Sequence, residues 1–234
     1  MEGALCGSEP DLRLIETLLW DGSHMPRLPR HLARLERSAI QLGWSCDQDA
    51  ARKALLAAAP PAAARMRLTL DATGRLEVTT APLTAAPTFW RLGLAKPRLA
   101  SDDPWLRIKS TRRPQHDSAR AAIPVALDEV ILLNERNEVC EGTITNIFFD
   151  LGEGLCTPPL LSGLLPGILR EELLESGECR QALLLREDLD HARLWVGNSL
   201  RGLIPAFIGN WGRFWGDLTQ ADFAPTRSGS GRMG

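Results

Sequence analysis

The stretch LPRHLARLERSAIQLG, residues 28–43, repeats apolar side chains at alternating steps of four and three residues. These side chains are Leu28, Leu32, Leu35, Ala39 and Leu42. Because an α-helix turns once in about 3.6 residues, this spacing places them on one stripe, and the glycine at position 43 is typical of a helix end. The stretch therefore predicts an amphipathic helix with one buried face.

Strand signals lie on both sides of this helix. Residues 12–19 read as a strand, and residues 65–70 and 75–80 alternate around a short turn, which is typical of a hairpin. A second, alanine-rich helix is expected from about residue 47 to 59, where a pair of prolines follows. The first part of the chain therefore reads as a small α/β unit.

Prolines become frequent between residues 87 and 104, as in a connection between domains. In the part that follows, apolar runs predict strands, and Gly167 precedes a helical pattern. The strand candidates are 130–133, 144–149, 182–185 and 194–196. We expect a small domain over 1–96, a linker over 97–104, a larger domain over 105–226 and a disordered tail over 227–234.

The composition excludes several classes of partner. The formal net charge is −2 and no lysine-rich run occurs, whereas nucleic acids and anionic membranes attract concentrated positive charge. No uncharged stretch is long enough to span a bilayer, and the N-terminus lacks a basic region followed by an apolar run. A soluble cytoplasmic protein that acts on a small molecule is expected.

Cysteine and histidine spacing gives no sign of a metal site. The five cysteines are widely spaced without a Cys-x-x-Cys pair, and the four histidines show no His-Glu-x-x-His pattern. We expect reduced, structural cysteines and no bound metal.

Lys109 is one of three lysines in a chain that otherwise carries its positive charge as arginine. It ends the alternating run Trp105-Leu106-Arg107-Ile108-Lys109, which predicts a short strand. A lysine can form an imine, which an arginine cannot do because it is always protonated. The alternative is an ordinary solvent-exposed lysine at a strand end.

Two further positions provide groups that a phosphorylated aldehyde cofactor needs. Glu141 follows an apolar pair and precedes a glycine, so a buried carboxylate that would pair with a protonated ring nitrogen is one interpretation, and an exposed hairpin glutamate is the other. Gly167-Ile168 opens a helix whose unpaired backbone N–H groups could bind a phosphate. The same pattern also occurs at ordinary helix starts.

Arg34 and Asn198-Ser199 complete the candidate site. Arg34 lies beside the leucine stripe and could reach a phosphate bidentately, or it could be a solvated arginine between Arg30 and Arg37. Asn198 and Ser199 follow an apolar run and add amide and hydroxyl groups, unless they form a simple loop. Taken together, these residues favour pyridoxal 5'-phosphate as the cofactor.

In this combination the chain resembles the class IV pyridoxal-phosphate enzymes, which include branched-chain and D-amino-acid aminotransferases and 4-amino-4-deoxychorismate lyase. The resemblance runs from residues 15–18 through 31–35, Lys109, 141–148 and 164–170 to 198–205. It implies a two-domain α/β (α+β) fold, with a small N-terminal α/β domain and a larger C-terminal pseudobarrel domain. It also implies a cofactor between the domains and a homodimer.

By this resemblance, Lys109 would carry the cofactor imine and move protons at the substrate carbon, and Glu141 would pair with the pyridine nitrogen. Arg34, Ile168, Leu169 and Ser199 would hold the phosphate. Relatives have Gly-Ile-Thr-Arg where this chain has a leucine at position 169, so one phosphate hydroxyl is lost and the backbone N–H groups remain.

The type of reaction is indicated by smaller features. The chain contains no tyrosine, so a D-amino-acid aminotransferase, which uses one to bind the substrate carboxylate, is disfavoured. Asn198-Ser199-Leu200 is similar to the Asn-Ala-Leu stretch of aminodeoxychorismate lyases, although the asparagine often found three residues after the lysine is absent. The resemblance favours a lyase that releases pyruvate and 4-aminobenzoate in folate biosynthesis. An aminotransferase for branched-chain or other amino acids and a non-catalytic cofactor-binding protein are the alternatives.

Overall fold

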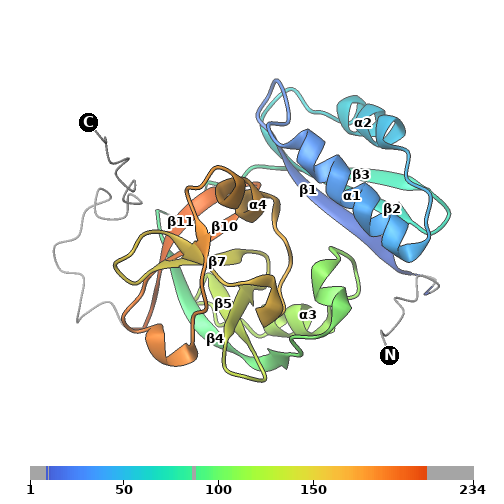
Figure 1. Ribbon diagram of the computed structural model, residues 1–234. Helices are drawn as coiled ribbons and strands as arrows, with labels where there is room; N and C mark the ends of the chain where they lie inside the picture. Colours follow the sequence, from blue (N-terminus) through green and yellow to red (C-terminus); the bar gives the residue numbers. More distant parts are fainter. Residues whose placement is uncertain (1–8, 10, 86–87, 210–234) are drawn as a thin grey trace, which may run out of the picture. The chain divides into compact units, whose positions relative to one another are not determined.

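The computed structural model describes residues 9, 11–85 and 88–209 (Figure 1). These residues form two compact units. The first contains the described residues up to 85 together with 102–114 and 199–202, and the second contains 88–101, 115–198 and 203–209. The disordered tail expected over 227–234 lies outside the described residues.

The first unit is a three-stranded antiparallel sheet with two helices. The strands are β1 (Arg13–Trp20), β2 (Ala64–Asp71) and β3 (Leu76–Pro82), in the order β1-β2-β3. The helices α1 (Leu28–Leu42) and α2 (Gln48–Ala57) lie against this sheet, and the 3-10 helix η1 spans Pro104–Arg107. The strands and helices expected in this part of the chain are therefore confirmed.

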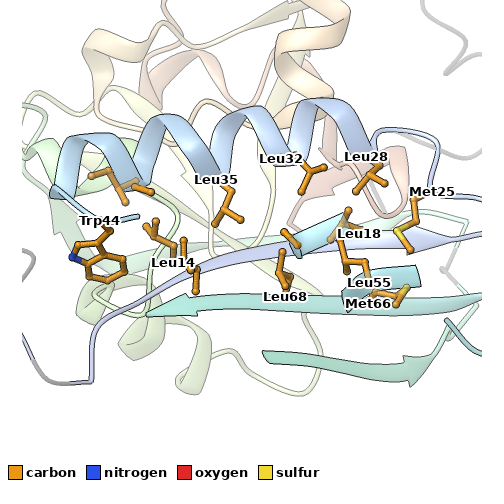
Figure 2. Packing of buried hydrophobic residues seen from close by; sticks show 14 of the residues in the cluster. Leu14, Leu18, Met25, Leu28, Leu32, Leu35, Trp44, Leu55, Met66 and Leu68 are labelled. Atoms are coloured by element: carbon orange, nitrogen blue, oxygen red, sulfur yellow. The ribbon is translucent and has the colours of Figure 1, made fainter. Parts of the chain in front are cut away.

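The core of the first unit forms where the leucine stripe of α1 meets β1 and β2. Figure 2 shows Leu28, Leu32 and Leu35 pointing from the helix towards Leu18 and Leu68 of the strands. The helix ends as predicted, because Gly43 has φ 70° and its backbone N–H donates to carbonyls of the last turn. The spacing of apolar residues thus determines which helix face is buried.

The second unit is built on an eight-stranded sheet in the order β10-β11-β4-β5-β6-β7-β8-β9. β10 also pairs with β7, so the strands from β10 to β7 close into a barrel, which confirms the expected pseudobarrel. The strand bounds are β4 Trp90–Leu99, β5 Glu129–Asn134, β6 Val139–Gly142, β7 Asn146–Asp150, β8 Cys156–Thr157, β9 Arg180–Gln181, β10 Arg193–Asn198 and β11 Gly202–Ile208. The helices are α3 Pro114–Ala121 and α4 Ile168–Glu175, with 3-10 turns η2 Leu160–Ser162 and η3 Arg186–Asp188.

Alternate residues of the barrel strands face two different clusters. Ile147 and Phe149 of β7 lie in one cluster with Val196 of β10. Phe148 lies in another with Leu169 of α4. Because successive strand residues point to opposite faces, one face of β7 packs within the barrel and the other receives α4. The helix after Gly167 is thereby fixed on the barrel.

Three expectations about local structure are wrong. The run 105–109 is not a strand, because the Asp103 carboxylate accepts from the Trp105 N–H at 2.9 Å and caps the 3-10 helix η1. Residues 182–185 do not form a strand, and Leu185 makes an isolated bridge with Glu138. β4 runs into the expected linker, and Pro97 is tolerated there because the pairing with β5 shifts register between Leu94 and Arg98.

The boundaries of the units also differ from the expected domains. Residues 105–114 were expected in the larger domain, but they belong to the first unit. The cause is backbone pairing beside β1, where the Ile15 N–H donates to the Lys109 carbonyl at 2.8 Å and the Thr111 N–H donates to the Arg13 carbonyl at 2.9 Å. The helix α3 and the strand β11 had no clear sequence signal.

Candidate active site

Lys109 is held by its backbone to the edge of the first sheet. Its carbonyl accepts from Ile15, and the next residue, Ser110, forms an antiparallel bridge with Leu14. Ser110 is buried, whereas Lys109 is half-buried. The main chain of the lysine is therefore fixed by β1 and its side chain keeps some access to solvent.

Arg34 lies in a buried charged cluster of the first unit rather than on an exposed helix face. Its Nε donates to Glu16 Oε1 at 2.9 Å and its Nη2 donates to Glu16 Oε2 at 2.6 Å. Nδ1 of His31 lies 2.6 Å from the same Oε2. All three residues are at most 5% exposed. The solvated alternative for Arg34 is thus wrong.

This cluster keeps Glu16 ionised. Burial alone would raise the pKa of Glu16, but the charge of Arg34 and the hydrogen bonds from His31 and Arg34 outweigh burial and lower it to about 2. A buried carboxylate with two partners is also a rigid anchor for the guanidinium. Glu16 therefore fixes the orientation of Arg34.

Asn198 and Ser199, which the sequence presents as one pair, belong to different units. Ser199 is in the first unit, where its hydroxyl donates to the Thr17 carbonyl at 3.4 Å and its own carbonyl accepts from Arg27 at 3.2 Å. Asn198 ends β10 in the second unit, and its side-chain amide donates to the Ile144 carbonyl at 3.3 Å. Ser199 also lines a surface hollow with His31 and Leu28.

Glu141 is buried in β6, which excludes the exposed hairpin alternative. It is 5% exposed, and its Oε1 lies 2.9 Å from Nε2 of His116 in α3. Among the described residues, no other group donates a hydrogen bond to this carboxylate. The next residue must be glycine, because a Cβ at Gly142 would lie 2.4 Å from Oγ1 of Thr145.

The turn after Glu141 is tied to a second buried carboxylate, Glu129, which is 0% exposed. Oε1 of Glu129 accepts from the Thr143 hydroxyl at 2.6 Å, and Oε2 accepts from the Ile144 backbone N–H at 3.2 Å. These bonds fix the turn between β6 and β7. Glu141 therefore sits at the start of a rigid turn.

The helix α4 begins at Gly167 without a side-chain cap. Its first backbone N–H groups, at Ile168 and Leu169, have no acceptor within the helix. The side chains of Ile168 and Leu169 are both buried, so only their backbone is offered at this end. A Cβ at Gly167 would lie 1.9 Å from Oδ1 of Asn146, so no side chain fits at this position.

The predicted site residues are thus distributed over both units. The first unit contains Lys109, Arg34 and Ser199, and the second contains Glu141, Ile168, Leu169 and Asn198. Sequence reasoning missed Glu16 and His116 as partners. Glu16 did carry a signal, since it is the single charged residue between Leu14 and Leu19, whereas His116 lies in a polar stretch without a pattern.

Three other features bear on the type of site. Within the described ranges, no group of three His, Cys, Asp or Glu residues could hold a metal ion. No helix in the same ranges is both long and apolar enough to cross a bilayer. Cys46, Cys140, Cys156 and Cys179 are not in disulfides, and Cys6 lies outside the described residues.

Comparison with known proteins shows similarity in both sequence and fold. The family described as Amino-transferase class IV matches residues 13–206. A Schizosaccharomyces pombe protein named "Putative aminodeoxychorismate lyase" is 32% identical over 199 residues, which cover 80% of this chain and 86% of that protein.

Solved structures are similar to most of this chain, and two of them illustrate the range. A "Putative amino-acid aminotransferase" from Mesorhizobium loti has 45% identity and a TM-score of 0.82, and the match covers 85% of this chain and 100% of that one. The 4-amino-4-deoxychorismate lyase of Pseudomonas aeruginosa has 27% identity and a TM-score of 0.76. The match covers 84% of this chain and 82% of that one. The chain therefore belongs to the class IV aminotransferase family and is an enzyme of that family.

Proposed function

We propose that this enzyme uses pyridoxal 5'-phosphate to convert 4-amino-4-deoxychorismate into pyruvate and 4-aminobenzoate. The observation that supports the cofactor is the buried Glu141, whose carboxylate has a single donor among the described residues. Support for the reaction comes from the similarity to proteins named as aminodeoxychorismate lyases. This activity would belong to folate biosynthesis.

The residues present fit such a cofactor in two respects. Glu141 offers Oε2 as an acceptor for a protonated ring nitrogen, because its one hydrogen bond within the described part of the chain is at Oε1. The start of α4 offers backbone N–H groups to a phosphate, since Gly167 provides no side-chain cap. The cofactor, when bound, would supply an electron sink at the substrate carbon.

Each candidate residue then has a defined task. The Nζ of Lys109 would hold the cofactor at rest and take the proton from the substrate ring carbon. Glu141 would keep the ring nitrogen protonated by opposing its charge. Arg34, Ser199 and the N–H groups of Ile168 and Leu169 would bind the phosphate, and Asn198 would contribute its amide nearby. Loss of the enolpyruvyl group makes the ring aromatic, and this favours the products.

A second candidate is an aminotransferase for branched-chain or other amino acids. It is favoured by the 45% identity to the Mesorhizobium loti structure, all of which is covered. The same Lys109 and Glu141 would serve, with Lys109 again moving the proton. The bound cofactor would supply the acceptor for the amino group, and a keto acid would be released. This reaction needs a second substrate, a keto acid that takes up the amino group, whereas the lyase reaction needs no such acceptor.

The deciding experiment is to measure pyruvate release from 4-amino-4-deoxychorismate by the cofactor-loaded enzyme, with no keto acid added. We expect many turnovers per enzyme molecule. Absence of pyruvate, together with a visible band that amino acids bleach and 2-oxoglutarate restores, would identify an aminotransferase instead. A protein that binds the cofactor but reacts with no amine would point to the non-catalytic alternative.

Replacement of Lys109 by alanine tests the central residue. We expect the turnover number to fall by at least about 10²–10⁴-fold, because the amine that moves the proton is removed. The matched controls are Lys53→Ala and Lys96→Ala. They replace the other two lysines, both of which are exposed. Unchanged turnover in Lys109→Ala would contradict both the lyase and the aminotransferase.

The homodimer and the cytoplasmic location are also part of this proposal. The dimer is supported by the family resemblance, and light scattering of the purified protein would measure its mass. A monomeric mass in a fully active sample would contradict it.

A further inference from the structure

Glu141 and His116 form a buried, hydrogen-bonded pair in the second unit. Nε2 of His116 lies 2.9 Å from Oε1 of Glu141. The His116 side chain is 9% exposed and the Glu141 side chain is 7% exposed. His116 is Glu141's one hydrogen-bond partner among the described residues. Any change at His116 therefore acts directly on the carboxylate.

The other ring nitrogen of His116 defines its protonation. Nδ1 is buried and has no hydrogen-bond partner among the described residues. A doubly protonated ring would place an N–H at this position without an acceptor, and a buried unpaired donor is unfavourable. The geometry therefore favours a neutral ring with its proton on Nε2, which donates to Glu141.

A second set of contacts fixes α3, the helix that carries His116. Nη1 of Arg120 lies 3.4 Å from the Thr143 hydroxyl and 3.7 Å from Oε1 of Glu129. Thr143 lies in the turn after Glu141, and Glu129 is the carboxylate that accepts a hydrogen bond from this turn. The donor in α3 and the acceptor in β6 are thus attached to the same rigid part of the barrel.

We propose that His116 is a positioning residue for the cofactor. By donating to Oε1, it fixes the rotation of the Glu141 carboxylate, so that Oε2 is presented to the ring nitrogen. The inference rests on the proposed cofactor and deepens it, since neither the family match nor the named relatives assign a role to this histidine. It does not depend on whether the reaction is a lyase reaction or a transamination.

The experiment is ¹⁵N NMR of enzyme loaded with pyridoxal 5'-phosphate that is labelled at the ring nitrogen. The ¹⁵N shift reports directly whether that nitrogen is protonated. The variants are His116→Leu, which removes the donor, and His116→Gln, whose terminal amide can restore a donor near Nε2. Cofactor dissociation constants are measured on the same samples, and Glu141→Gln is the reference for a neutral partner.

We expect wild type and His116→Gln to show a protonated ring nitrogen. His116→Leu should shift towards the Glu141→Gln value and bind the cofactor roughly tenfold more weakly, the effect of one hydrogen bond to a charged group. If the leucine variant does not fold, His116→Asn gives the same reading, because its side chain is too short to reach Oε1.

Two outcomes would overturn the inference. One is a ring-nitrogen shift and a dissociation constant in the donor-free variant that equal those of wild type. The other is full additivity of His116→Leu and Glu141→Gln in cofactor affinity, since residues that act through one another must be non-additive. Failure of the proposed function is distinguishable, because borohydride would then attach no cofactor to Lys109 of the wild-type enzyme.

Discussion

Glu16 shows how one buried charge can organise its surroundings. It is 1% exposed, yet it lies on a strand and binds both Arg34 and His31 of α1. Removing one partner of a buried ion pair is costly, because the remaining charge stays in a medium that solvates it poorly. The cluster is therefore a strong link between β1 and α1.

Replacement of Glu16 by glutamine tests this link. We expect the free energy of unfolding to fall by about 3 kcal/mol, because Arg34 keeps its buried charge and loses its counter-charge. Urea denaturation of the cofactor-free protein measures the change. The control is Glu153→Gln, which removes the charge of an exposed ion pair. Oε2 of Glu153 lies 2.7 Å from Nη2 of Arg180, and the change should lower the unfolding free energy by less than about 1 kcal/mol. Equal effects of the two changes would contradict the buried-link interpretation.

At the residue scale, the sequence was informative about residue types and less so about partners. The sequence points to Glu141 because a buried carboxylate needs a cationic partner, and to Arg34 because it lies beside the leucine stripe and could reach a phosphate. Their observed partners, Glu16 and His116, come from other elements. Periodicity describes one element at a time, so it could not show these pairs. The proposed cofactor contacts stay predictions for the same reason.

The start of α4 is the element where backbone and packing are most tightly linked. Gly167 is its N-cap, and Asn146 of β7 occupies the space that a side chain would need. The Asn146 amide in turn donates to the Leu165 carbonyl at 3.0 Å. The helix start is therefore attached to the barrel through one asparagine.

Replacement of Gly167 by alanine should disturb this attachment. The new Cβ would lie 1.9 Å from Oδ1, so Asn146 must move and lose its bond to Leu165. We expect a loss of about 1–3 kcal/mol in unfolding free energy, as for other overpacked sites. In an Asn146→Ala background the same change should cost much less. A cost that is independent of residue 146 would show that the clash is not the cause.

Elements were predicted well where one strong pattern acted alone. The helix over 28–42 ends at Gly43 as its sequence indicates. Prediction failed where two signals competed, because the Asp103-Pro104 helix start overrode the alternation of 105–109. It also failed at β4, where Pro97 suggested a linker but lies at a shift in strand register. Long-range pairing decides such cases.

On the scale of the whole molecule, several carboxylates are stabilised in their ionised form. Burial raises the pKa of Glu16, yet its partners lower it from the usual 4.5 to about 2. The bond from Arg136 is the main cause that lowers the pKa of Glu138 to about 2. For Asp150, burial opposes the N–H groups of Gly152 and Gly154, and the pKa is lower than usual. Both units contain such groups.

These shifts predict the acid behaviour of the protein. A carboxyl group with a lower pKa in the folded state stabilises the fold above its unfolded pKa, and this contribution is lost as the pH falls through the folded value. We therefore expect the contribution of these carboxyl groups to the unfolding free energy to be nearly constant from about pH 7 to 5 and to decrease from about pH 4.5 towards 2. Urea denaturation at a series of pH values measures this. The Glu16→Gln variant should show a shallower decrease, and an identical slope would contradict the role of Glu16.

The segment 109–111, which pairs with the start of β1, has a consequence for protein synthesis. β1, β2 and β3 are complete once residue 82 has been made, but the strand edge at Arg13 and Ile15 is covered only when Lys109 and Thr111 follow. At ribosomal rates this leaves an interval on the order of seconds. During it, unpaired backbone groups of β1 can pair with a neighbouring chain. The growing polypeptide therefore exposes an edge that can aggregate until the lysine segment emerges.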